Sequence, residues 1–419
     1  MPAASEWTGP LRLLRFGSRC GENRGFRLPA TRKLVGFDDV TLRQMGDRRI
    51  VVFGATGYTG RFVAERLAAA GVRPALAGRD PAKLEALAER IGGAEVVKAD
   101  VFRQNSVFEM AGDGDVVVST VGPFMKWGEP AVRAVIAAKG IYIDSTGEPP
   151  FIRRVFEEFG PAAERSGASL LTAMGYDFVP GVLAGALALR EAGERAVRVE
   201  IGYYALGAGV GTTSPGTKES LVGVSLEPGF AFRGGRIRRE RAASRLRSFH
   251  VKGRDRLAFS VAGAEHYTLP AAFPRLRDVD VYIGAGPLSR AVQGATLTNS
   301  LLTRLPGAKP IMRFTGERVM ALMPSAAPGE TGGALSWVAA AAYDAAGEQL
   351  AEVHRSGADP YAFTGAFLAW AARRAATAGV EGAGALSPVT AFGLDALEQG
   401  AAEAGISGAP APAPRPARG

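Results

Sequence analysis

The chain has 419 residues, of which 47% are hydrophobic and 22% are charged, and its formal net charge is +9. This composition is that of a folded globular protein, and the length exceeds the roughly 250–300 residues at which one core stops growing, so we expect two domains. The single cysteine, Cys20, excludes an internal disulfide framework, and the three histidines show no zinc-binding spacing. The scarcity of cysteine favours a reducing, cytoplasmic setting, and no apolar run reaches the roughly 18 residues that a membrane span needs.

The positive charge is concentrated near the ends of the chain. Residues 1–44 contain eight basic and four acidic residues, and Arg415 and Arg418 lie close to the C-terminus. The remaining excess is small for a chain of this length, and no recognition motif accompanies it. We therefore expect no nucleic-acid partner.

Both ends of the chain lack a folding pattern. Residues 1–44 form a predicted N-terminal extension, rich in Arg and Gly and without helical or strand periodicity. One interpretation is an Arg-rich transit peptide; the one that we prefer is that the native protein starts at Met45, because the first strand follows almost at once. Residues 408–419 are a Pro-Ala repeat and predict a disordered tail.

Residues 45–190 alternate short apolar runs with helical patterns. The predicted strands are Ile50–Phe53, Ala75–Ala77, Glu95–Ala99, Asp115–Thr120, Ile141–Ile143 and Ala168–Ala173. The predicted helices are Thr59–Ala70, Lys83–Ile91, Glu129–Ala138 and Phe151–Glu164. Parallel strands require crossover connections, which helices supply, so this order predicts an α/β fold with a Rossmann-type, doubly wound parallel sheet.

The pattern changes in residues 191–358. Longer strands, which we expect to be antiparallel, are predicted at Ala196–Ala205, Gly229–Arg238, Arg256–Val261, Val279–Ile283 and Ser336–Tyr343. They indicate an inserted α+β second domain, for substrate binding or for formation of a homodimer. In residues 359–407, two helices, Pro360–Thr377 and Val389–Ala404, are expected to pack back on the first domain.

A glycine-rich turn follows the first strand. Gly54, Gly57 and Gly60 lie where a strand turns sharply into a helix whose free N–H groups can face a pyrophosphate, and a Cβ there would collide with backbone or ligand. The flanking apolar strand and amphipathic helix are the context that makes this pattern informative. The turn predicts a dinucleotide site that also includes Thr56, Tyr58 and Thr59.

The residue at the end of the second strand indicates whether NAD or NADP binds. NAD sites usually place an acidic residue there, about 20 residues after the glycines, to bind the ribose 2′-hydroxyl. Here Arg79 occupies that position, and a guanidinium pairs with a 2′-phosphate, so we predict NADP(H). Asp80 is expected to cap the next helix, while Lys83 and Arg61 are either further phosphate contacts or solvated surface residues.

Two further strand ends belong to the predicted cofactor site. Asp100 and Val101 follow the third strand and are expected beside the adenine. The segment Thr120-Val121-Gly122-Pro123 follows the fourth strand and is expected near the nicotinamide ribose, because open α/β sheets bind ligands at the carboxyl ends of their strands. An ordinary turn is the alternative for Gly122-Pro123.

Several motifs together resemble the saccharopine dehydrogenase-like oxidoreductases, and among them the trans-acting enoyl reductases. The motifs are Gly54-Ala-Thr-Gly-Tyr-Thr-Gly-Arg61, Val121-Gly-Pro-Phe124, Tyr142-Ile-Asp-Ser-Thr-Gly-Glu148, Gly175-Tyr-Asp-Phe-Val-Pro-Gly181, Ser214-Pro-Gly-Thr-Lys-Glu-Ser220, Asp359-Pro-Tyr361 and Ser387-Pro-Val-Thr-Ala-Phe-Gly393. The resemblance spans roughly Arg48 to Ile406. It implies a Rossmann-type domain, an inserted α+β domain and NADP, and it leaves the substrate open because fold-level likeness cannot choose among reactions.

No residue is singled out as the proton donor that a hydride-transfer reaction requires. The Tyr-x-x-x-Lys pair of short-chain dehydrogenases is absent. Candidates by position are Lys126, Tyr142, Asp144, Tyr176 and Asp177. For each a structural role is the alternative: Asp144 and Asp177 as helix caps, and Tyr142 as a core residue.

The segment Arg233–Arg256 contains ten basic residues and two acidic ones. It predicts a docking site for an acidic acyl-carrier protein, a CoA phosphate or an anionic membrane surface, which would make the protein membrane-peripheral. A solvated hairpin edge is the alternative.

The leading functional hypothesis is a reductase of an enoyl thioester or related lipid intermediate, with an elongated apolar cleft. A non-catalytic NADP-binding or membrane-surface protein and an amino-acid dehydrogenase are the alternatives.

Overall fold

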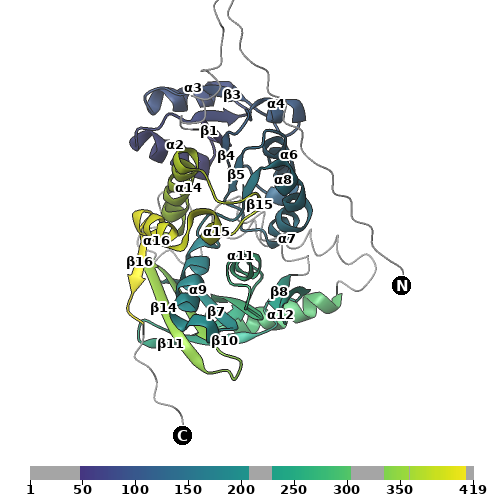
Figure 1. Ribbon diagram of the computed structural model, residues 1–419, viewed down its shortest axis with the longest axis vertical. Helices are drawn as coiled ribbons and strands as arrows, with labels where there is room; N and C mark the ends of the chain where they lie inside the picture. Colours follow the sequence, from purple (N-terminus) through teal and green to yellow (C-terminus); the bar gives the residue numbers. More distant parts are fainter. Residues whose placement is uncertain (1–47, 207–228, 303–334, 358, 412–419) are drawn as a thin grey trace, which may run out of the picture. The chain divides into compact units, whose positions relative to one another are not determined.

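The computed structural model describes residues 48–206, 229–302, 335–357 and 359–411. The predicted extension at residues 1–44, Met45, the segment Ser214–Ser220 and residues 412–419 of the predicted tail lie outside this described part. Within it, the elements build two β-sheets with helices between and around them (Figure 1).

The first sheet has seven strands and is parallel throughout. Its strands are β1 (Ile50–Phe53), β2 (Ala75–Gly78), β3 (Val96–Lys98), β4 (Val116–Ser119), β5 (Ile141–Asp144), β6 (Ser169–Leu171) and β15 (Gly384–Ala385). They lie in the order β15-β6-β5-β4-β1-β2-β3. β1, β2, β4 and β5 are buried over their whole length, which explains their continuous apolar sequences. The predicted doubly wound sheet is confirmed, and its strand order reverses between β1 and β4.

Helices cover both faces of this sheet and create two separate apolar cores. One face carries α2 (Tyr58–Ala69), α3 (Pro81–Arg90) and α14 (Pro360–Ala378). The other carries α4 (Gln104–Glu109), α5 (Phe124–Trp127), α6 (Glu129–Ala137), α7 (Pro149–Arg154) and α8 (Gly160–Ser166). α14 contacts α2 and the central strands, so the C-terminal part of the chain returns to the first sheet, as expected.

The predicted helix Phe151–Glu164 forms with an irregularity. α7 and α8 are joined by a π-helical turn, Val155–Phe159, in which the N–H of Gly160 bonds to the carbonyl of Val155. Pro161 follows directly, and a proline ring clashes with the carbonyl four residues earlier in a regular α-helix. The wider turn accommodates this proline.

The second sheet has nine strands and is mixed. Its strands are β7 (Arg198–Leu206), β8 (Phe230–Arg233), β9 (Arg236–Arg239), β10 (Leu246–Val251), β11 (Arg254–Ser260), β12 (Asp278–Gly284), β13 (Leu335–Tyr343), β14 (Gln349–Gly357) and β16 (Ile406–Ala409). The main order is β10-β11-β12-β7-β13-β14-β16, with the β8–β9 hairpin attached to β12. The expectation of antiparallel strands is wrong for one pair, because β7 and β12 run parallel. Strand patterning reveals burial and not direction, so the sequence could not show this.

The remaining helices lie in the chain either between strands of the two sheets or between strands of the second sheet. They are α9 (Val179–Ala192), α11 (Glu265–Ala272), α12 (Leu288–Leu302), α15 (Pro388–Phe392) and α16 (Leu394–Glu403), with a short 3₁₀ turn, Gly193–Arg195, after α9. α9 packs on β13, β14 and β7 on one side and on α11, α15 and α16 on others, so eleven of its fourteen residues are buried. The predicted domain boundary after residue 190 therefore separates α9 from the sheet on which it packs.

The C-terminal segment departs from its prediction in two places. The predicted helix Val389–Ala404 is divided into α15 and α16 at Gly393, whose φ of +80° favours glycine. β16 pairs with β14 and includes residues 408 and 409, which the sequence assigns to the tail. The chain thus adds one strand to each sheet after α14.

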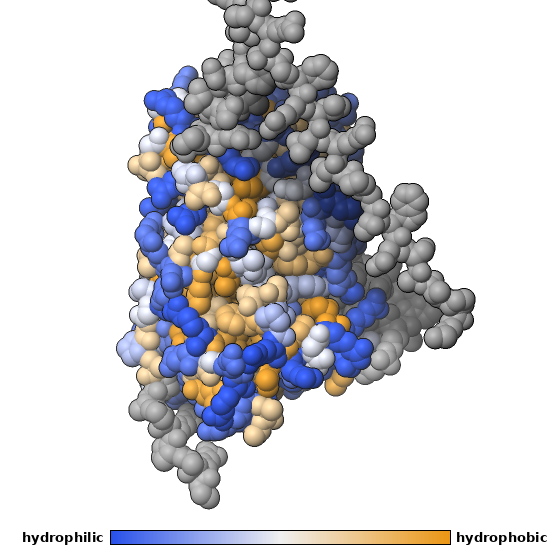
Figure 2. Space-filling model, viewed as in Figure 1, coloured by the Kyte–Doolittle hydropathy of each residue, from blue (hydrophilic) through white to orange (hydrophobic). Residues whose placement is uncertain are grey.

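Hydrophilic residues cover much of the face shown in Figure 2, and apolar residues gather across its middle, over the helices that connect the two sheets. Among the described residues, no helix combines the length and the apolar character that crossing a bilayer requires.

Candidate functional site

The glycine-rich turn joins β1 to α2 with a geometry that only glycine permits. Gly54 has a φ of +85°, and its N–H donates to the carbonyl of Ala77 over 2.8 Å. A Cβ on Gly54 would lie 2.8 Å from Thr120 Oγ1, and one on Gly60 would overlap the carbonyl oxygen of Gly54. The backbone of the turn is therefore packed against itself and against the end of β4.

The N-terminus of α2 is open for an anion. Its N-cap, Gly57, offers no side chain to the first N–H groups, the first turn contains no acidic residue, and Thr56 and Gly57 are exposed. Helix N-termini without such caps keep unsatisfied N–H donors and a partial positive charge. This is the arrangement that binds the pyrophosphate of a dinucleotide.

Arg79 and Asp80 at the end of β2 differ in what they contact. Asp80 caps α3: its Oδ1 accepts from the N–H of Lys83 over 3.3 Å, and its Oδ2 lies 3.5 Å from Lys83 Nζ. Arg79 is exposed and makes no ion pair with another described residue. The acid is thus engaged locally, while the guanidinium is open to a ligand.

In the strand order, β4 lies directly beside β1, which carries the glycine turn, and β3 lies beside β2. Asp100 is half-buried, and its Oδ1 accepts from the N–H of Phe102 over 3.1 Å. The hydroxyl of Thr120 lies 3.0 Å from the carbonyl of Phe53 and 3.2 Å from that of Gly54, and so links β4 to the glycine turn. Val121 is half-buried, and the Gly122-Pro123 peptide bond is cis.

A buried carboxylate holds the segment that follows this peptide. Glu148, after β5, accepts from the N–H groups of Phe124 (2.7 Å) and Met125 (3.0 Å) at the start of α5. Lys126 in the same helix is exposed, with its Nζ 4.7 Å from the centre of the Trp127 ring. Glu148 was not among the predicted site residues, although it closes the quoted motif that begins at Tyr142.

Two of the predicted proton donors lie in the core. Tyr142 and Asp144, on β5, are both 0% exposed. Asp144 accepts from the N–H groups of Thr146 and Ala173, both over 2.9 Å, and from the Thr172 hydroxyl over 2.8 Å. Burial raises its pKa to about 6 despite these bonds, and burial also raises the pKa of Tyr142. Asp144 thus ties the ends of β5 and β6 together and caps no helix.

The other two donor candidates follow β6. Tyr176 is 9% exposed, its N–H donates to Thr364 Oγ1 over 3.0 Å, and burial raises its pKa. Asp177 is exposed, and desolvation by the surrounding protein raises the pKa of its carboxyl to about 6. The predicted cap role of Asp177 is wrong, because α9 begins after Phe178 without a side-chain cap.

The motif Asp359-Pro-Tyr361 brings α14 to the glycine turn. Asp359 Oδ1 accepts from the N–H groups of Tyr361 (3.0 Å) and Ala362 (3.2 Å) and so caps the helix. The ring of Tyr361 lies 5.4 Å from that of Tyr58, at the start of α2. Further along, Gly365 lies against Phe62, where a Cβ would come within 2.8 Å of the phenylalanine Cβ. The close approach of α14 to α2 therefore depends on this glycine.

Two buried residues, Tyr203 and Glu265, lie against the segment after β6 and were not predicted. The hydroxyl of Tyr203 (β7) lies 2.8 Å from the carbonyl of Phe178 and 2.6 Å from Glu265 Oε1 (α11). The charge of Asp177 contributes to the raised pKa values of both Tyr203 and Glu265. Neither residue lies in a motif, so the sequence offered no signal for them.

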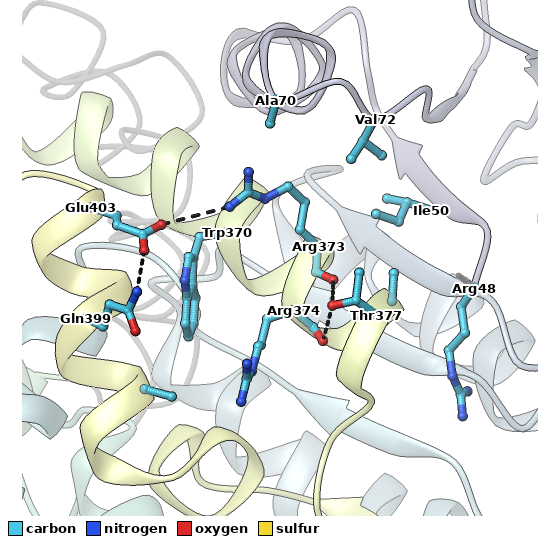
Figure 3. Close-up of a pocket in the computed structure, with 12 residues that line it drawn as sticks. Arg48, Ile50, Ala70, Val72, Trp370, Arg373, Arg374, Thr377, Gln399 and Glu403 are labelled. Carbon is cyan, nitrogen blue, oxygen red and sulfur yellow. Dashed lines mark hydrogen bonds and ion pairs between the residues drawn. The ribbon is translucent and has the colours of Figure 1, made fainter. Parts of the chain in front are cut away.

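A cavity of about 430 Å³ lies at the opposite, amino-terminal edge of the first sheet (Figure 3). Ile50, Val72 and Trp370 line it, with arginines at positions 48, 373 and 374. Figure 3 shows that these guanidinium groups do not converge, and Arg373 points toward Glu403, 3.9 Å away. This cavity is therefore separate from the predicted cofactor site and offers no focused anion site.

The segment Arg233–Arg256 divides into paired and exposed arginines. Arg233 pairs with Asp280, Arg245 with Glu240 and Asp280, and Arg247 with Glu200. The exposed basic residues are Arg236, Arg238, Arg239, Lys252 and Arg254. Part of the run thus stabilises the second sheet and part faces solvent. No group of three or more potential metal ligands occurs among the described residues.

Comparisons with known proteins agree with this geometry. Residues 54–141 match an NAD(P)H-binding family model. The chain is 40% identical over 140 residues to a trans-acting enoyl reductase of Mycobacterium tuberculosis (32% of this chain, 33% of the relative) and 36% identical over 140 residues to one of Mycobacterium ulcerans (32% and 34%). A lipid droplet localized protein of Caenorhabditis elegans is 32% identical over 146 residues (32% and 34%). These alignments cover about a third of the length of the curated relatives.

Among solved structures, saccharopine dehydrogenase (L-Glu forming) of Saccharomyces cerevisiae superposes with a TM-score of 0.54 at 14% identity, over 84% of this chain and 96% of that one. This likeness shows the fold and leaves the reaction open. Over about a third of its length the chain is therefore similar to the trans-acting enoyl reductases, residues 54–141 match an NAD(P)H-binding family model, and the fold is that of saccharopine dehydrogenase.

Proposed function

We propose that this protein is an NADP(H)-dependent oxidoreductase that reduces the C=C bond of an enoyl thioester. The preference for NADP is supported by Arg79, which is exposed and without an acidic partner among the described residues, while Asp80 is occupied by α3. The trans-acting enoyl reductase names of the relatives support the reaction.

The chemistry divides between the cofactor and this chain. When bound, NADPH supplies a hydride to the β-carbon of the enoyl group. One proton must then reach the α-carbon, and this chain must position the substrate and deliver that proton or order a water that does. Asp177 is the described carboxyl best placed for this, because it follows β6 at the ligand-binding edge and is exposed.

The charge around this edge is the observation that favours a thioester over an amino acid. The described ionisable groups after β6 and at the start of α14 are Tyr176, Asp177, Asp359 and Tyr361, and burial together with the charges of both aspartates raises the pKa of Tyr176. An amino-acid dehydrogenase needs cationic side chains to bind the substrate carboxylate, and acidic groups repel it. A thioester carries no charge at the reacting carbons and is not repelled.

The test is NADPH oxidation with a series of enoyl-CoA thioesters of increasing chain length. We expect turnover that falls by about a hundredfold in Asp177→Asn, since loss of a proton donor costs at least that much. Asp113→Asn, an exposed aspartate before β4 at the other edge of the sheet, is the matched control and should keep wild-type turnover. NADPH binding without oxidation by any member of the series would favour a non-catalytic NADP-binding protein.

We also propose that the protein contacts an anionic lipid surface through α12 and the strands beside it. Leu288 and Leu297 of α12 are 67% and 50% exposed, and Ile283 of β12 is 41% exposed. An open hollow of about 580 Å³ next to them is lined by arginines at positions 254, 256 and 290. Apolar side chains flanked by basic ones are the composition that binds anionic membrane surfaces. The name of the lipid droplet localized relative supports this proposal.

A further inference from the structure

A carboxyl group is buried at the beginning of α11, away from the predicted cofactor residues. Glu265 is 0% exposed, and its Oε2 makes no hydrogen bond within the described part of the chain. Burial and the nearby charge of Asp177 raise its pKa to about 8, and the bond with Tyr203 offsets part of this shift. An apolar residue would fill this position at lower cost, so the carboxyl needs an explanation beyond packing.

The hydroxyl of Tyr203 is the centre of this arrangement. It accepts from the N–H of Gly181 over 2.9 Å, and it lies 2.8 Å from the carbonyl of Phe178 and 2.6 Å from Glu265 Oε1. A tyrosine hydroxyl has one hydrogen, so it cannot donate to both Phe178 and Glu265. When Glu265 is protonated, it can donate to Tyr203, and Tyr203 can then donate to Phe178. When Glu265 is ionised, it attracts the only hydroxyl hydrogen and the Phe178 carbonyl loses its donor.

These bonds hold one end of the segment Gly175–Gly181, which carries Asp177. The other end is held separately, because the N–H of Met174 donates to the carbonyl of Asp144 over 2.7 Å. The fit around Tyr203 and Glu265 is tight: a Cβ on Gly181 would overlap the Tyr203 hydroxyl, and one on Gly263 would overlap Glu265 Oε2. Two glycines therefore admit the pair, and the pair reaches across from the second sheet to the segment after β6.

Among the ionisable groups around Glu265, its own carboxyl is the one whose protonation state changes near pH 8. On the segment side, Asp177 and Tyr176 act on the pair, and burial raises the pKa of Tyr203 well above its ordinary range. On α11 itself, His266 is buried and its pKa is lowered to about 4, so it is neutral; Asp280 and Arg233 act on this histidine from β12 and β8. At neutral pH both tyrosines keep their protons, and Glu265 is the carboxyl of this cluster that keeps its own.

We propose that Glu265 is a positioning residue, which through the Tyr203 hydroxyl holds the segment Gly175–Gly181 and so places Asp177 in the site. The placing of Asp177 rests on the proposed reductase function. The hydrogen-bond chain from Glu265 through Tyr203 to Phe178 does not depend on it. Glu265 touches neither substrate nor cofactor in this role.

The experiment compares wild type with Glu265→Gln, whose amide N–H₂ can donate to Tyr203 at every pH as the protonated acid does. Hydrogen–deuterium exchange of the peptide covering residues 175–181 is measured below and above pH 8, corrected for the intrinsic pH dependence of exchange. We expect protection in wild type to fall above pH 8 and protection in Glu265→Gln to stay constant. The control is Glu157→Gln, which alters another tyrosine–glutamate pair, in which Tyr267 donates to Glu157 over 2.8 Å. This control should behave as wild type.

The same variants give a catalytic readout. If enoyl-CoA turnover is found, kcat of wild type should fall above pH 8, the alkaline fall should disappear in Glu265→Gln, and KM should change little. Tyr203→Phe, which removes the hydroxyl, should lower kcat by about tenfold, the equivalent of one lost hydrogen bond, with NADPH binding unchanged. Constant protection of residues 175–181 in both wild type and Glu265→Gln overturns the inference. Absence of turnover with the exchange result intact overturns only the proposed function.

Discussion

At the scale of single residues, the atoms around Gly54 and Gly60 explain why the turn after β1 has glycine at these positions. Gly60 faces the carbonyl of Gly54, and Gly54 faces Thr120 and Val121. Each contact leaves no room for a Cβ, so the turn, the helix start and the end of β4 form one packed unit. The motif could be predicted because Gly54 and Gly60 are close in sequence, whereas their packing against Thr120 and Val121, at the end of a distant strand, could not.

Gly60→Ala should displace this turn and weaken NADPH binding by tenfold or more, about 1.4 kcal/mol. Gly294→Ala is the matched control, because a Cβ on Gly294 of α12 would have no other atom within 4 Å. Fluorescence titration with NADPH measures both, and thermal unfolding shows that each variant is folded. Wild-type affinity in Gly60→Ala would mean that the turn can relax and that the close packing is not required.

Glu265 illustrates a residue that no local pattern reveals. Its partner Tyr203 is 62 positions away, and the two meet only because β7 and α11 lie against the segment after β6.

The pKa of Glu265 is raised from 4.5 to about 8, so between these two pH values the folded protein keeps a proton that the unfolded chain has lost. The free energy of unfolding should therefore fall as pH rises from about 4.5 to about 8 and level off above that range. Chemical denaturation of Glu265→Gln over this range should show a smaller fall than wild type; an equal fall would place the proton elsewhere.

At the scale of elements, the apolar strands of the first sheet were predictable and several elements of the second were not. β1, β4 and β5 are continuous apolar runs, because the sheet buries both of their faces. β14 mixes polar and apolar residues, with only part of its length buried, and was missed. Pairing direction was also beyond prediction, since parallel β7 and β12 look like any other half-buried strands.

α12 shows what an element can present to a partner. Its exposed Leu288 and Leu297 and the neighbouring arginines should bind vesicles that contain phosphatidylglycerol more strongly than neutral phosphatidylcholine vesicles, by about 1 kcal/mol for each arginine at the surface. Replacing Leu288, Leu297, Arg254 and Arg290 with Gln should abolish this preference in a co-sedimentation assay. Arg165→Gln, an exposed arginine of α8, is the control. Equal binding to both vesicle types, or binding to an acidic acyl-carrier protein in their place, would contradict the lipid assignment.

At the scale of the whole molecule, the two sheets share an apolar core. Residues of β1, α2 and α14 belong to the same buried cluster as residues of α9, β7 and β13. The C-terminal segment strengthens this link, because β15 joins the first sheet and β16 joins the second. The return of the C-terminal helices was expected, whereas β15 has only two residues and β16, Ile-Ser-Gly-Ala, has one large apolar residue, so neither shows a strand pattern.

The central claim is that the edge formed by the ends of β1, β2 and β4 binds NADP(H). The most direct test is a fluorescence titration of the purified protein with NADPH and with NADH, with Arg79→Glu beside wild type and Arg165→Glu as the charge-matched control. We predict that wild type and the control bind NADPH much more tightly than NADH, and that Arg79→Glu loses or reverses this preference because a carboxylate repels the 2′-phosphate. Failure of wild type to bind either nucleotide, or an unchanged preference in Arg79→Glu, would contradict the account.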